Sequence, residues 1–580
     1  MGSAPWAILD FPGPDGQPAR EIYRDPVAVV ATSAAGRVRA TLGEVERLSA
    51  AGHHLIGFVA YDAAPAFEPR FEVRRGYDGP LVWFAAFRGP TGESLQRGPT
   101  DGGPETWEPP ANADAYRAAI AEIIEGIGRG DFYQVNFTER FRSAVSDPLG
   151  LYERLRLAQG KGYFAFIDTG ETQVASVSPE LFVRRSGRTL ESRPMKGTAA
   201  RGRWFAEDEA LARGLAASEK ERAENVMIVD LIRNDMGRIA IPGTVEVPSM
   251  FTVERFPTVL QMTSHVKSEV PADTTLEDVF TALFPCGSVT GAPKIAASKS
   301  IAALESEPRG VYCGAVGVVR PGGDFTFNVA IRTAVVGADG RAIYGAGGGI
   351  TADSDPQREL DELFTKAAVL TAAPERFGLI ETMRLEDGII HRLERHLARL
   401  ESSAQYFGFQ DQAAAVRRIR DELLSQAAER PGGIQRVRVL LGRDGSHEIV
   451  VEPFAPAVAP RCLALSAEPV DSRDRLLYHK VSDRSRYSSR LGGLQEADDV
   501  LLVNERGELT ETTIGNIVLE LDGRRVSPPL ESGLLPGVYR GELLAAGEIE
   551  ERLLYPADLA RCTALWMINS LRGWVECRMA

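Results

Sequence analysis

Three things are scarce in this chain of 580 residues: cysteine, lysine and long apolar runs. The five cysteines stand far apart, with no CxxC pair and no adjoining histidine, so neither a disulfide framework nor a zinc site is indicated. No stretch of about 18 apolar residues occurs, and the N-terminus lacks the basic start and apolar core of a signal peptide. We therefore expect no membrane partner and a reducing, cytoplasmic setting.

The net charge and the small number of lysines restrict the possible functions further. The net charge is -14 and no Lys/Arg-rich run occurs, which argues against a nucleic-acid partner because phosphate neutralisation needs a basic face. Only eight lysines occur among the 66 basic residues, so arginine carries most of the positive charge. An arginine stays protonated and cannot act as an amine nucleophile. The few lysines are therefore the first places to look for amine chemistry.

The chain is too long for one hydrophobic core, and its patterns divide it into two modules. A Gly/Pro-rich stretch around residue 97 reads as a linker, and residues 113–131 then show apolar positions at helical spacing. Strand-like segments and a long helical region follow, until a new pattern starts near 372–378. No internal repeat is visible. We predict an α+β chain with domains at 1–372 (core about 111–372) and 376–580.

The first domain carries an acid and an amine at a suggestive spacing. The segment SPELFVRRSGRTLESRPMKGTAARG places Glu180 and Lys196 sixteen residues apart, each beside turn residues and on what read as adjacent strands. A carboxyl group and an amine held close together can serve as acid and nucleophile if burial tunes their pKa values. A structural ion pair is the alternative, and these residues alone favour it.

Further polar clusters indicate a metal ion and an anionic ligand. Glu359 and Glu362 share a helix face, and Glu224 lies in the helical segment ENVMIVDLIRND, so carboxylates suited to Mg²⁺ are present. Carboxylate-binding candidates come from FPCGSVTGAPK, FNVAIRT and YGAGGGI, through backbone N–H groups and a guanidinium. The residues concerned are Thr290, Arg332, Gly347, Gly348 and Gly349.

In this order, these segments resemble the chorismate-utilising enzymes, a family that includes anthranilate, aminodeoxychorismate, isochorismate and salicylate synthases. The resemblance covers about 111–372 and implies stacked antiparallel sheets with flanking helices, with chorismate and Mg²⁺ between them. It implies that Glu224 and Glu362 hold the metal, with Glu359 close by, and that the threonine, the arginine and the three glycines hold the substrate carboxylates.

Two positions distinguish the members of the family. Isochorismate-type members have a water-activating lysine where this chain has Gln134, which cannot act as a base. The turn PMKGT places Lys196 where anthranilate synthases have a small residue, and it resembles the nucleophile of aminodeoxychorismate synthases, with Glu180 as general acid. Anthranilate synthases also have a histidine where Gln261 stands, and we transfer that role neither to it nor to His265.

The nitrogen source is not encoded in these residues, since no Gly-x-Cys-x-Gly nucleophile turn occurs. We expect ammonia from a separate glutamine amidotransferase subunit, or free ammonia.

The second domain has a single lysine, Lys480, so any Schiff-base chemistry there must use it. Around it stand the segments ERHLARLESSA, HKVSDRSRY, TETTIGNI, LLPGVYRGELL and WMINS. In this order they resemble the fold-type IV pyridoxal phosphate enzymes, which include branched-chain and D-amino acid aminotransferases and aminodeoxychorismate lyase. The resemblance implies that Lys480 carries the cofactor, that Glu511 partners the pyridine nitrogen, and that the phosphate is held by Arg399, Val538, Tyr539 and Ser570. It also implies a homodimer, and Arg484 is lyase-like.

Together, the two resemblances imply 4-aminobenzoate synthesis from chorismate, as in folate biosynthesis, because the product of one domain is the substrate of the other. The alternatives are an anthranilate synthase-like domain fused to an aminotransferase, and a scaffold with decayed sites. Lys196 and the pairing of the domains argue against the first, and the retention of every residue type that the chemistry needs argues against the second.

Overall fold

The computed structural model describes residues 4–13, 18–93, 95, 105–110, 112–371, 377–455, 460–491 and 497–580. The chain forms two compact units: the first comprises Met1–Ala200 with Ala212–Glu375, and the second Arg376–Ala580 with Arg201–Leu211. Most of the expected boundary at 372–378 and of the expected linker around residue 97 lies outside the described residues. None of the helices in the described ranges is both long and apolar enough for a membrane span.

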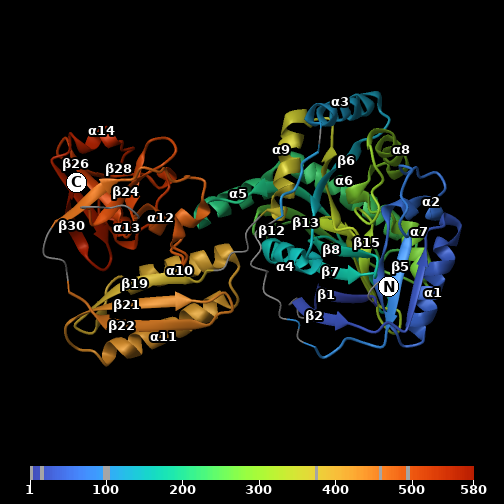
Figure 1. Cartoon of the computed structure of the whole chain (residues 1–580), viewed down its shortest axis with the longest axis horizontal. Helices are drawn as coiled ribbons and strands as arrows, with labels where there is room; N and C mark the ends of the chain where they lie inside the picture. The colour runs from blue at the N-terminus through green and yellow to red at the C-terminus, as the bar shows by residue number, and fades with distance from the viewer. Residues whose placement is uncertain are drawn as a thin grey trace. The chain divides into compact units, whose positions relative to one another are not determined.

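The first unit is built on two antiparallel sheets (Figure 1). The eight-stranded sheet has the order β14 (Gly291–Ala292), β6 (Gln134–Ala144), β18 (Arg341–Ile350), β17 (Thr333–Gly337), β8 (Thr172–Ser178), β7 (Tyr163–Asp168), β1 (Trp6–Pro12), β2 (Pro18–Tyr23). The ten-stranded sheet has the order β11 (Met195–Ala200), β13 (Val259–Glu269), β10 (Thr189–Arg193), β9 (Leu181–Ser186), β16 (Phe325–Val329), β15 (Ala315–Val319), β4 (His54–Val59), β5 (Val82–Phe87), β3 (Ala28–Thr32), with β12 (Glu246–Arg255) on β13.

The two sheets stack face to face, because one apolar cluster takes Leu9 and Ile167 from the first sheet and Phe58 and Val316 from the second. A second cluster packs helices onto the outer face of the eight-stranded sheet: α3 (Ala113–Arg129), α4 (Pro148–Gln159), α8 (Lys294–Leu304) and α9 (Pro356–Ala367). A third packs α1 (Val38–Ala50), α6 (Glu219–Gly237) and α7 (Leu276–Leu283) onto the ten-stranded sheet. The expected α+β fold of stacked antiparallel sheets with flanking helices is confirmed.

Capping residues set the bounds of the helices that position the site. The helix expected at 113–131 is α3, which starts after the Asn112 cap and stops at Gly130 in the left-handed conformation. The long helical region expected after the strand-like segments is two helices, α5 (Phe205–Ala217) and α6, because Ser218 caps the second one. This cap sets the start of α6 and thereby the position of Glu224 on it.

The second unit contains two sheets of its own. The smaller has the order β20 (Ile389–Ile390), β19 (Leu379–Glu386), β21 (Ile434–Leu441), β22 (His447–Pro453). Its apolar face packs on α10 (Leu393–Phe407) and α11 (Gln412–Ala428). The larger is mixed and has the order β25 (Leu509–Thr512), β24 (Asp499–Val503), β23 (Arg461–Leu465), β30 (Gly573–Met579), β29 (Ala564–Asn569), β26 (Asn516–Leu521), β27 (Arg524–Ser527), β28 (Glu550–Glu551). A further pairing of β25 with β26 closes it on itself.

Candidate active sites

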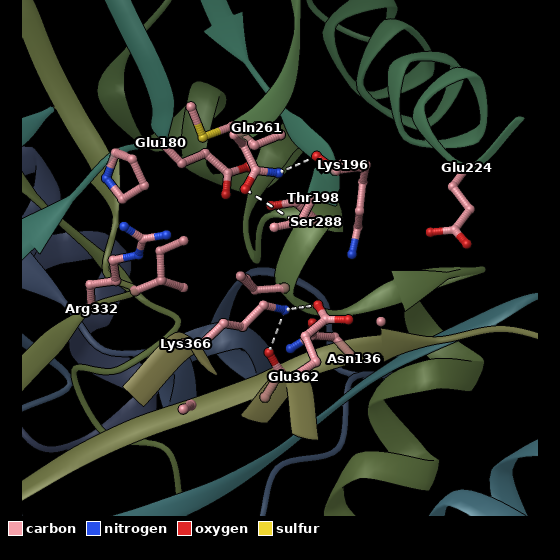
Figure 2. Close-up of a pocket in the computed structure, with 18 of the residues that line it drawn as sticks. Asn136, Glu180, Lys196, Thr198, Glu224, Gln261, Ser288, Arg332, Glu362 and Lys366 are labelled. Carbon is pink, nitrogen blue, oxygen red and sulfur yellow. Dashed lines mark hydrogen bonds and ion pairs between the residues drawn. The ribbon is translucent and has the colours of Figure 1, made fainter. Parts of the chain in front are cut away.

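The first unit has a polar cavity at the ends of strands from both sheets (Figure 2). Most residues expected in the first site line it: Glu180, Lys196, Glu224, Arg332, Gly347, Gly349, Glu359 and Glu362. Thr290 lies behind this lining, fully buried, and its hydroxyl donates to the Cys286 carbonyl at 2.9 Å. Gly348 lies on β18 with the other two glycines. A Cβ atom on Gly348 would lie 3.1 Å from the carboxylate of Glu359. The structure thus gathers five separate motifs into one place.

The Glu180–Lys196 pair is brought together by strand register. Glu180 immediately precedes β9, which pairs with β10, and Lys196 follows on β11, just beyond Pro194. Burial raises the pKa of the Glu180 carboxyl to about 7, although Ser288, Lys196 and the Met195 N–H act in the opposite direction. Burial, and secondly the nearby Lys366 ammonium, lower the pKa of Lys196. Both shifts favour a neutral amine beside a protonated acid.

The GAGGG strand leaves room for these groups. A Cβ atom on Gly349 would lie 1.9 Å from the Gln134 amide nitrogen and 2.6 Å from the Lys196 amine. A Cβ atom on Gly347 would lie 2.1 Å from the Phe137 carbonyl of the paired strand β6. Any side chain at these positions would therefore displace the amine or break the sheet.

Arg332 is an anion-binding candidate on geometric grounds. It adopts a left-handed backbone conformation with φ of 50°, which is costly for a residue with a Cβ and is often found at functional sites. Its guanidinium contacts the Gln159 side chain, and it has no carboxylate partner among the residues that the structure describes. Burial lowers the pKa of this group. A cation buried without a counter-charge is well suited to an anionic ligand.

The three expected metal ligands line one side of the cavity. Burial raises the pKa of Glu224 and of Glu359, and neighbouring carboxylates add to both shifts, whereas the Lys366 ammonium lowers the pKa of Glu362. Lys366 lies 2.7 Å from Glu362 and donates to the Gly347 carbonyl at 2.9 Å. In the described ranges, no three acidic, His or Cys side chains converge into a ready-made metal site. The carboxylates still fit Mg²⁺, because this ion keeps several of its water ligands and needs only one or two carboxylates from the protein.

Sequence reasoning missed Lys366 and the support around Lys196. Lys366 reads as an ordinary partner four residues after Glu362 on an exposed helix face, so no local signal marked it. Gln261 donates to the Gly197 carbonyl at 3.0 Å, and Asn225 donates to the Lys196 carbonyl at 3.3 Å. Gln261 therefore holds the turn that carries the lysine, and His265, which does not line the cavity, lies 3.8 Å from Glu191.

The second unit has a cavity lined by every residue expected in the second site: Arg399, Lys480, Glu511, Val538, Tyr539 and Ser570. Burial, and secondly Arg399, lower the pKa of Lys480 to about 8. Burial raises the pKa of Glu511 to about 7, and its carboxylate accepts from the Tyr487 hydroxyl at 3.0 Å and from the Asn516 amide at 3.2 Å. A carboxyl held this way can share a proton with a pyridine nitrogen, which is what pyridoxal phosphate needs.

The start of α13 (Val538–Ala545) lines this cavity, and the first N–H groups of a helix are available to an anion. Arg399 donates to Glu381 at 2.9 and 2.7 Å and to the Pro536 carbonyl at 3.0 Å. His396 shares Glu381 at 2.7 Å. Burial acts to raise the pKa of Glu381, but the Arg399 guanidinium and the hydrogen bonds from His396 and Arg399 hold it at about 2. Sequence reasoning named Arg399 but missed its buried partners Glu381 and His396.

The fold and the two cavities define a class: a chain of two α+β units, each with a lysine in a polar pocket suited to anionic ligands. A model of the chorismate binding enzyme family matches residues 16–372, and the chain belongs to this family. A model of the class IV amino-transferases matches residues 378–579, which implies pyridoxal phosphate as the cofactor of that part.

Individual relatives support the first match. The chain is 39% identical over 267 residues to aminodeoxychorismate synthase component 1 of Bacillus subtilis, covering 46% of this chain and 57% of the relative. It is 41% identical over 280 residues to anthranilate synthase component 1 of Streptomyces coelicolor, covering 48% and 55%. The solved anthranilate synthase component I of Streptococcus pneumoniae superposes with a TM-score of 0.52 at 27% identity, covering 64% and 91%. The alignments thus span little more than half of the two curated relatives.

Proposed function

We propose that the first unit converts chorismate and ammonia into 4-amino-4-deoxychorismate and water, and that the second converts this product into 4-aminobenzoate and pyruvate. The observation that carries the proposal is Lys196 beside Glu180 in one cavity, with the amine shifted toward neutrality and the carboxyl toward protonation. This is the combination that nucleophilic displacement of a hydroxyl group requires.

In the first reaction, the neutral amine of Lys196 would add to C2 of the ring while the 4-hydroxyl leaves with a proton from Glu180. Ammonia would then add at C4 and expel the lysine from C2, which returns the ring's two double bonds to their original positions. Arg332 and the N–H groups of the GAGGG strand are suited to hold the substrate carboxylates. Glu224 and Glu362, with Glu359, would hold Mg²⁺, which supplies charge neutralisation for a carboxylate.

In the second reaction, pyridoxal phosphate would supply an electron sink at the amino group of the substrate. Arg399, Ser570 and the N-terminus of α13 would bind its phosphate, and Glu511 would hold a proton at the pyridine nitrogen. Lys480, with its pKa lowered to about 8, would remove the proton from C4 of the substrate ring. The C3–oxygen bond then breaks, pyruvate leaves as its enol, and the ring becomes aromatic.

An anthranilate synthase is the second candidate, because one relative of that name is 41% identical. The lysine in PMKGT argues against an anthranilate synthase. In that reaction ammonia attacks C2 directly, so the Lys196 amine would have no catalytic role. The test is a time course of the whole chain with chorismate, ammonium, Mg²⁺ and pyridoxal phosphate. We expect 4-aminobenzoate and pyruvate in equal amounts, whereas anthranilate would rule the proposal out.

The partners belong to the same proposal. A separate glutaminase subunit would supply the ammonia, so glutamine should replace ammonium only when such a subunit is added. The homodimer remains a prediction, which light scattering of the purified chain would test.

A further inference from the structure

The cavity of the second unit has far more positive charge than the cofactor needs. Seven arginine and lysine side chains line it, against the single carboxylate of Glu511. Three of the arginines have carboxylate partners outside the lining: Arg399 with Glu381, Arg436 with Glu452 and Arg540 with Glu551. Arg438, Arg484 and Arg572 have no carboxylate partner anywhere in the described ranges.

The register of the small sheet explains why Arg438 is unpaired. Its neighbours Val437 and Val439 point into the apolar core under the helices, so the alternation of the strand places Arg438 on the cavity side. Across the ladder, Arg436 faces Glu452, but Arg438 faces Thr382 on one side and Val450 on the other. The strand therefore presents one neutralised and one free guanidinium to the cavity.

Arg572 approaches the same cavity from the turn after β29. Its backbone N–H donates to the Asn569 side chain at 2.8 Å, which fixes the turn next to Ser570. Its guanidinium stacks over Phe454 at 5.0 Å, and burial with the nearby Arg461 and Arg436 lowers its pKa. Arg436 is paired with Glu452, whereas Arg572 has no carboxylate partner in the described ranges and is left as an uncompensated charge on the lining of the cavity.

Arg484 has a different position. It donates to the Thr513 carbonyl and lies 4.8 Å over the ring of Tyr487, the residue that binds Glu511. It therefore belongs to the Glu511 side, and two free guanidiniums remain.

We propose that Arg438 and Arg572 form a dicarboxylate-recognition site, which selects substrates with two carboxylates on one ring system. The inference rests on the proposed lyase function, whose substrate has a ring carboxylate and an enolpyruvyl carboxylate. One guanidinium for each carboxylate would orient the ring so that its amino group faces Lys480. Ordinary monocarboxylate amino acids would satisfy only one of the two.

The test uses the whole chain loaded with pyridoxal phosphate, titrated with isophthalate and with benzoate while the cofactor absorbance is followed. Neither compound has an amino group, so neither can react. We expect isophthalate to bind about tenfold or more tightly than benzoate, because its second carboxylate accepts an additional charge-assisted hydrogen bond. R438Q and R572Q should each remove most of this preference, whereas R438K and R572K should keep part of it.

Arg417, an exposed arginine of α11 that does not line the cavity, provides the matched control R417Q, which should bind both compounds like the parent chain. In steady-state assays with added aminodeoxychorismate, R438Q should raise KM about tenfold and leave kcat nearly unchanged. Equal binding of the two compounds by the parent chain, or an unchanged preference in both glutamine variants, would overturn the site. A dicarboxylate preference without formation of 4-aminobenzoate would instead keep the site and refute the lyase function.

Discussion

The two lysines are held in contrasting ways. Lys196 lies at the start of an edge strand, has a protonatable acid beside it, and shares its cavity with Lys366 and three carboxylates that suit a metal. Lys480 shares its cavity with Glu511, whose pKa is also raised to about 7, but that carboxylate accepts hydrogen bonds from Tyr487 and Asn516. Burial, and secondly Arg399, lower the pKa of Lys480. The first cavity is thus arranged for a nucleophile with an acid, and the second for an amine that carries a cofactor and moves one proton. The following variants test that contrast.

The largest effect is expected from K480A. No other lysine lies in 376–580, so conversion of added aminodeoxychorismate should fall by about 10³-fold or more. The visible absorbance of bound cofactor should be lost with it, while the consumption of chorismate continues. Retention of the absorbance in K480A would mean that the cofactor is held by other contacts.

K196A should have the opposite pattern, with amination of chorismate reduced by about 10³-fold and the second reaction unchanged. The matched control is K299A, an exposed lysine of α8 that does not line the cavity. Chorismate consumption and conversion of added aminodeoxychorismate are measured separately. Normal amination by K196A would exclude the lysine as nucleophile and remove the contrast between the units.

A smaller effect, about 10²-fold on amination, is expected from E180Q. The reaction needs a proton on Glu180, whose pKa is about 7, and none on Lys196, so its pH profile should be bell-shaped. The rate should rise with pH as the Lys196 amine loses its proton, and it should fall at higher pH as the Glu180 carboxyl loses its proton. E180Q should keep the rise and lose the alkaline decline, and a decline that persists would assign it to another group.

The smallest effect is expected from R332Q, which removes a carboxylate contact and leaves the reacting groups in place. KM for chorismate should rise about tenfold or more, with a smaller change in kcat. R341Q, at an exposed arginine of β18, serves as control. An unchanged KM would show that Arg332 has a purely structural role.

The sequence predicts the fold and the reacting residues better than it predicts their support. PMKGT, GAGGG and the lone Lys480 are local signals, because each needs a particular residue type at a particular position. Arg399 was predicted, but its buried partners Glu381 and His396 were missed, and so was Lys366, since each of these three taken alone reads as an ordinary polar residue on a strand or helix face. Arg438 was missed for the same reason, because its lack of a partner depends on how β21 pairs with β19 and β22.

The central claim is that Lys196 and Lys480 serve successive steps on one molecule. The most direct test is to identify, by mass spectrometry and NMR, what K480A accumulates from chorismate, ammonium and Mg²⁺. We predict 4-amino-4-deoxychorismate, which the parent chain should then convert into 4-aminobenzoate. Accumulation of anthranilate or isochorismate would contradict the account.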